Sequence, residues 1–66
     1  MEKLLEKLEA AVLVLECIWR MRECENSYAV ERAYDILEEF LKEGDNSLEA
    51  ARRLAERMDE VLEECD

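Results

Sequence analysis

The sequence contains no histidine and no proline, and it has only one glycine and three cysteines among its 66 residues. Without histidine, a cysteine lacks the base that usually activates it as a nucleophile. Without proline, and with a single glycine, little in the chain interrupts a long helix. The composition is instead rich in Glu, Leu, Ala and Arg, which are good helix formers. We therefore expect an all-α protein that carries no catalytic nucleophile.

Long uncharged stretches are missing as well. The most apolar stretch, residues 10–21 (AAVLVLECIWRM), contains a glutamate and is shorter than the roughly 18 residues that a membrane-spanning helix needs. The stretch MEKLLEKLEAA at the N-terminus has glutamates at positions 2, 6 and 9, whereas a secretion signal has an uncharged centre. We expect neither a transmembrane segment nor a signal peptide.

Positive charge is scarce, with 9 basic against 19 acidic residues and a net charge of -10 at pH 7. Such a charge repels nucleic acids and anionic membranes, so we expect neither as a partner. It also keeps a small apolar domain soluble and monomeric when free. The length corresponds to one small domain, residues 1–66, which buries only about 60% of the surface that its unfolded chain exposes.

Polar and glycine residues divide the chain into three expected helices, at about residues 2–24, 27–43 and 48–65. Asn26 or Ser27 can cap the second helix, and Ser47 is the favoured cap of the third. Gly44 stands where the second helix needs a left-handed residue to end. Loops this short make neighbouring helices antiparallel. The sequence thus predicts a single up-down-up three-helix bundle.

The first helix differs from the other two because it has two apolar stripes rather than one. We expect one stripe to face the core, and it consists of Leu4, Leu8, Val12, Leu15, Trp19 and Arg22, flanked by Leu5, Ala11 and Ile18. The other stripe lies on roughly the opposite side and consists of Ala10, Leu13, Val14, Cys17 and Met21.

This second stripe has three explanations. The helix is buried all round by slanted packing, or the stripe pairs with a second copy of the chain, or it binds a different protein. We expect the third, since anchors at i, i+3/4, i+7 and i+11 suit a helix that docks on a partner. Arg20 borders the stripe and Tyr28 lies just beyond the loop, and both residue types are enriched in binding hot spots. The expected partner-binding residues are Ala10, Leu13, Val14, Cys17, Arg20, Met21 and Tyr28.

The three cysteines fit the same layout. Cys24 and Cys65 end the first and third helices at one pole of the bundle, whereas Cys17 lies about 10 Å further along the first helix. We therefore expect a Cys24–Cys65 disulfide and a free Cys17. The alternative is that all three are reduced and act as small apolar residues. On an ideal helix Cys24 projects away from the expected core stripe, so the pairing requires the last turn to unwind.

The other forms of site chemistry are not expected. The carboxylates are spread along the solvent-facing sides of the helices, and a bundle of this size has no room for a large pocket. The cysteines lack the CxxC spacing of zinc sites, and there are no Glu-x-x-His pairs for a di-iron site. We expect no enzyme activity, no cofactor and no metal.

Three features resemble a known class of proteins: the loop KEGDNS at residues 42–47, the idealised helix LEAARRLAE at residues 48–56, and the Glu/Lys/Leu-rich start of the chain. Together with the short loops they resemble computationally designed three-helix mini-protein binders. The resemblance covers all 66 residues. It implies a synthetic protein without a native cellular location, intended for extracellular use.

The same resemblance implies a function. Members typically bind an extracellular receptor domain or a viral surface protein through one or two helices, which places the contact on the first helix and the start of the second, and the expected effect is blocking. Some members carry an added disulfide, which matches Cys24 and Cys65. Cys17 departs from the pattern because designs avoid exposed thiols. The alternative function is a designed module that associates with copies of itself through the first helix.

Overall fold

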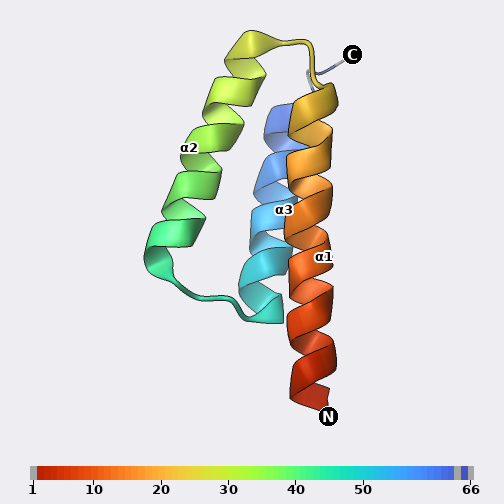
Figure 1. Ribbon diagram of the computed structural model, residues 1–66. Helices are drawn as coiled ribbons and strands as arrows, with labels where there is room; N and C mark the ends of the chain where they lie inside the picture. Colours follow the sequence, from red (N-terminus) through yellow and green to blue (C-terminus); the bar gives the residue numbers. More distant parts are fainter. Residues whose placement is uncertain (1, 64, 66) are drawn as a thin grey trace.

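The computed structural model describes residues 2–63 and 65, and it consists of three α-helices (Figure 1). They are α1 (Glu2–Glu23), α2 (Ser27–Glu43) and α3 (Leu48–Leu62). Helix α2 runs antiparallel to α1 and α3, so the predicted all-α, up-down-up three-helix bundle is confirmed. The predicted ends agree to within one residue except for α3, which ends at Leu62 rather than at residue 65.

The loops end and start the helices with the residues expected from the sequence. The side-chain oxygen of Asn26 accepts hydrogen bonds from the backbone N–H groups of Tyr28 (3.1 Å) and Ala29 (3.3 Å). Gly44 ends α2 with φ of 68°, in the left-handed region that glycine adopts without strain. The hydroxyl of Ser47 accepts a hydrogen bond from the N–H of Ala50 at 3.2 Å. The Asn26 and Ser47 side chains thus satisfy backbone N–H groups that the helices themselves leave unpaired.

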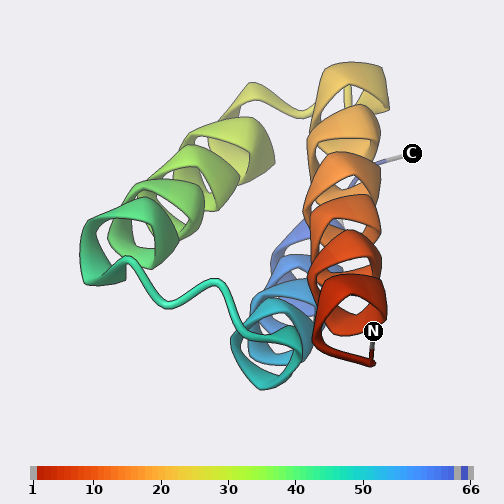
Figure 2. The same cartoon turned by 60° about the horizontal axis from the view of Figure 1, so that its bottom comes forward.

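Helix α3 is the central element of the bundle. It packs against both other helices, whereas α1 and α2 touch each other only marginally. The two ribbon views agree, since α2 stands apart from α1 while α3 lies close beside α1 (Figures 1 and 2). The bundle is therefore elongated and thin, with extents of 39 × 21 × 15 Å. In the part of the chain that the structure describes, each outer helix has one close neighbour, so a large part of α1 stays in contact with solvent.

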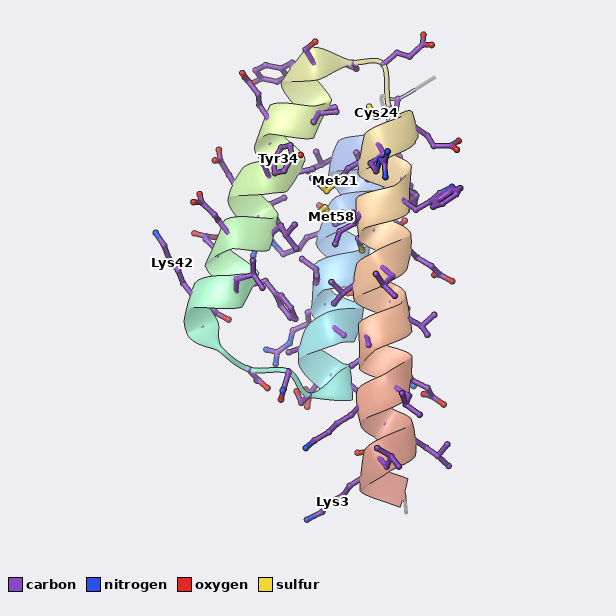
Figure 3. All side chains as sticks on the ribbon, in the orientation of Figure 1. Lys3, Met21, Cys24, Tyr34, Lys42 and Met58 are labelled. Carbon is purple, nitrogen blue, oxygen red and sulfur yellow. A yellow bond between two sulfur atoms is a disulfide. The ribbon has the colours of Figure 1, made fainter. Side chains whose placement is uncertain are left out.

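The core lies along α3 and is built from small and flexible side chains. Met58 is fully buried at its centre, and Figure 3 shows it next to Met21 of α1, in the space between the helices. Small residues from α1 and α2 complete this contact and allow the helices to approach closely. The buried core cluster consists of Cys17, Met21, Ala29, Ala33, Leu54, Met58, Val61 and Leu62.

A disulfide between Cys24 and Cys65 joins the end of α1 to the residues after α3, as predicted. The two Cα atoms are 5.0 Å apart, a normal distance for a disulfide. Helix α1 ends at Glu23, and the N–H of Cys24 bonds to the carbonyl of Met21 at 3.3 Å, so the chain tightens after the helix. The unwinding expected at this point is therefore not seen: Cys24 follows a tightened last turn and still reaches its partner.

We predict that reducing this disulfide lowers the free energy of unfolding by about 4 kcal/mol, because the bond closes a long loop in the unfolded chain. The two cysteines are 41 residues apart in the sequence. Urea denaturation with and without reductant measures the difference. A double variant, Cys24→Ala with Cys65→Ala, is the control and should match the reduced protein under both conditions. Equal stability of the oxidised and reduced forms would contradict the prediction.

Candidate functional site

The side of α1 that packs against the core is opposite to the side expected from the sequence. The stripe that we expected to bind a partner faces α3 and the core, and we call it the inner face. Ala10, Cys17 and Met21 are 3–5% exposed, and Leu13 and Val14 are half-buried. The expected partner-binding role of these five residues therefore loses its basis, which was that they could not all reach the core.

The stripe that we assigned to the core lies instead on the solvent side of α1, and we call it the outer face. Its large side chains are between 53% and 67% exposed, with Trp19 the most exposed of all. Such a row is unusual in a small soluble monomer, where large apolar side chains are mostly covered. The outer face consists of Leu4, Leu5, Leu8, Val12, Leu15 and Trp19.

The remaining two expected partner residues lie on different helices. Arg20 is exposed near the upper end of α1 and forms an ion pair with Asp59 of α3, so it ties the two helices together at the surface. An exposed pair of this kind contributes at most about 1 kcal/mol to stability. Tyr28 is 65% exposed on the first turn of α2. The structure therefore does not join these two residues and the inner face into one surface.

The outer face has the spacing of a coiled-coil seam, with steps of three and four residues that alternate along the helix. The seam residues are Leu5, Leu8, Val12, Leu15 and Trp19. On this spacing, the positions that border the seam on one side are all acidic, and we call them the glutamate row: Glu9, Glu16 and Glu23. The positions that border it on the other side are apolar: Leu4, Ala11 and Ile18.

Grooves beside α1 show which border of the seam faces α3 and which faces α2. An apolar groove of about 400 Å³ lies between the N-terminal half of α1 and the start of α3, and Glu9 and Arg52 both line it. A second hollow of about 290 Å³ is lined by Trp19 and Glu23 of α1 and by Leu62 of α3. The glutamate row therefore runs along the α3 side of the seam. Ala11 lines a smaller groove with Phe40 of α2, so the apolar edge faces α2.

The inner face also holds Cys17, the free thiol, and its burial there explains why it is unpaired. Cys17 is 3% exposed and belongs to the core cluster. Its burial raises the pKa of the thiol, as do the charges of Asp59 and Glu16, while Arg20 opposes the rise. A buried, protonated thiol is a poor nucleophile. Cys17 is therefore a small core residue rather than an exposed contact residue.

One sequence signal pointed to the correct face of α1. Ala10, Cys17 and Cys24 are seven residues apart, so they follow one side of the helix. A Cys24–Cys65 bond places that side against α3, and the inner face with it. Arg22 gave a second signal, because it continues the stripe that we had assigned to the core, and a charged residue is rarely buried without a partner.

Comparisons of the chain with protein-family models, with curated proteins and with solved structures found no match. Within residues 2–63 and 65, no helix combines the length and the hydropathy that crossing a bilayer requires. The same residues contain no cluster of acidic and cysteine side chains arranged to bind a metal ion. The outer face of α1 is thus the candidate site, and its chemistry is that of apolar contact.

We predict that a charge introduced on the outer face of α1 has little effect on stability, whereas one introduced on the inner face is strongly destabilising. We expect Leu15→Glu and Trp19→Glu, on the outer face, to change the free energy of unfolding by less than about 0.5 kcal/mol. Met21→Glu on the inner face should lower it by about 3 kcal/mol or more, because it buries an unpaired carboxylate. Urea denaturation followed by circular dichroism measures all three variants. Unfolding by the outer-face variants, with Met21→Glu tolerated, would reverse the assignment of the faces.

Alkylation followed by mass spectrometry tests the cysteines. We expect the unreduced native protein to take up label slowly, and the same protein unfolded in urea to take up one label, at Cys17. The raised pKa means that the native state favours the protonated thiol. The stability gained by burying the protonated Cys17 thiol is therefore complete below the ordinary thiol pKa of about 8.5. It is lost as the pH rises further. A Cys17→Ala variant should lack this part of the pH dependence. Three labels without reductant, or fast labelling of the native protein, would contradict this account.

Proposed function

We propose that this protein binds another protein through the outer face of α1, without catalysing a reaction. One observation carries the proposal: six large apolar side chains lie in an unbroken exposed row on a helix whose opposite face already fills the core. Burying a Leu-sized side chain on binding contributes roughly 1.5–3 kcal/mol. Three or four such anchors are enough for a tight and specific interaction.

The surface area supports the same conclusion. The chain exposes 5319 Å², whereas a folded monomer of 7.8 kDa is expected to expose about 4,400 Å². The excess of roughly 900 Å² is close to the area of about 800 Å² that each partner buries in a standard protein–protein interface. An excess of this size in a thin bundle supports the proposal that one face is available for a partner.

The class of target follows from the resemblance to designed three-helix binders alone. It implies an extracellular receptor domain or a viral surface protein, which the protein would block by occupying its surface. A single monovalent domain cannot cross-link two receptor chains, which favours blocking over activation. The sequence predicts the contact on the first helix and the start of the second. In this proposal the contact lies on the first helix alone and on its other face.

We predict that an outer-face charge weakens target binding without unfolding the protein. The test is biolayer interferometry of the protein against a panel of purified extracellular receptor domains and viral surface proteins. For any target bound, Leu15→Glu should weaken binding at least about ten-fold, because it removes one anchor and desolvates a carboxylate.

A matched control comes from α2. Leu41 is 65% exposed and Leu15 is 63% exposed, so Leu41→Glu introduces the same charge at a site of equal exposure on another helix. It should leave binding unchanged. Equal loss of binding in both variants, or none in Leu15→Glu, would contradict the proposed site. Sedimentation of the free protein as a stable dimer would instead favour self-association.

A further inference from the structure

We infer that the partner of the outer face is an amphipathic α-helix that carries a row of lysine or arginine residues along the edge that meets the glutamate row of α1. The inference rests on the proposed function and names the chemistry of its partner. A helix is the occupant because the outer face repeats at the three- and four-residue steps of a helix–helix seam. The seam from Leu5 to Trp19 is about 21 Å long at 1.5 Å per residue, which corresponds to about two heptads.

One border of the seam is acidic and the other is apolar, and this determines the sign of the charge that the partner carries. Glu9, Glu16 and Glu23 are exposed on the α3 side, and neither ion pair in the described part of the chain uses any of them. Three basic groups lie nearby: Arg52, which lines a groove with Glu9, Arg20, which is already paired with Asp59, and Arg22, which is exposed at the seam position after Trp19. Along the rest of the seam the bordering charges are acidic. Residues at such bordering positions choose partners in helix pairs by charge complementarity.

A second copy of this chain does not fit the same seam. In an antiparallel pair the glutamate rows of the two copies would face each other, and in a parallel pair each row would face the apolar edge of the other copy. Like charges in direct opposition are unfavourable, and so are carboxylates pressed against apolar side chains. Each copy also carries a net charge of -10. The seam therefore accepts a basic partner helix and rejects its own copy.

The experiment uses two synthetic helical peptides of about three heptads with the same leucine seam. One has lysine, and the other glutamate, at the positions that meet the glutamate row. Trp19 is the only tryptophan and lies in the seam, so the blue shift of its fluorescence reports binding directly. We expect the lysine peptide to bind at least about ten-fold more tightly, and we expect the difference to shrink in about 1 M salt, where charges are screened beyond roughly 3 Å.

A charge exchange on the protein completes the test. Glu9→Lys, Glu16→Lys and Glu23→Lys together should reverse the preference, so that the glutamate peptide binds more tightly. If this variant does not fold, the two-peptide comparison on the unchanged protein is sufficient by itself.

Equal binding of both peptides would overturn the basic partner while leaving the proposed function intact. Failure of both peptides, with a panel target still lost in Leu15→Glu, would overturn the helical partner only. Formation of a stable dimer would overturn the exclusion of a second copy.

Discussion

The packing of α1 against α3 determines which part of this protein is available for function. Helix α3 contacts both other helices, and within the described residues α1 has no other close neighbour. The Cys24–Cys65 disulfide holds the end of α1 to the end of the chain, and it places the side that carries Cys17 against α3. Once that side is covered, the opposite side of α1 has no structural partner. The outer face is exposed as a consequence of this one contact.

Residue size explains why the helices choose this arrangement. The buried positions of α1 and α2 are mostly small, with alanines and a cysteine at the contacts. Small side chains let the helix axes approach closely, so that Met58 and the other α3 residues fill the remaining space. The larger leucines and Trp19 of α1 would hold α3 further away. Turning them outward gives a tighter core, but it leaves their apolar surface in water.

An apolar row on the surface of a small protein normally leads to aggregation. Here the acidic excess counters it, both through the net charge of -10 and through the glutamates that border the seam. In the proposed interaction the same charges disfavour a second copy and favour a basic surface over an acidic one.

The sequence by itself determined the three helices, their loops and caps, the up-down-up order and the disulfide. These depend on local properties: helix propensity, the side-chain oxygens of Asn26 and Ser47, and the left-handed conformation of Gly44. It also showed that α1 has two apolar stripes, but it led to the wrong assignment of them. Both stripes follow helical spacing, so periodicity alone has no preference between them. Only the tertiary structure decided which one is covered, because that choice depends on how closely α3 can approach each face.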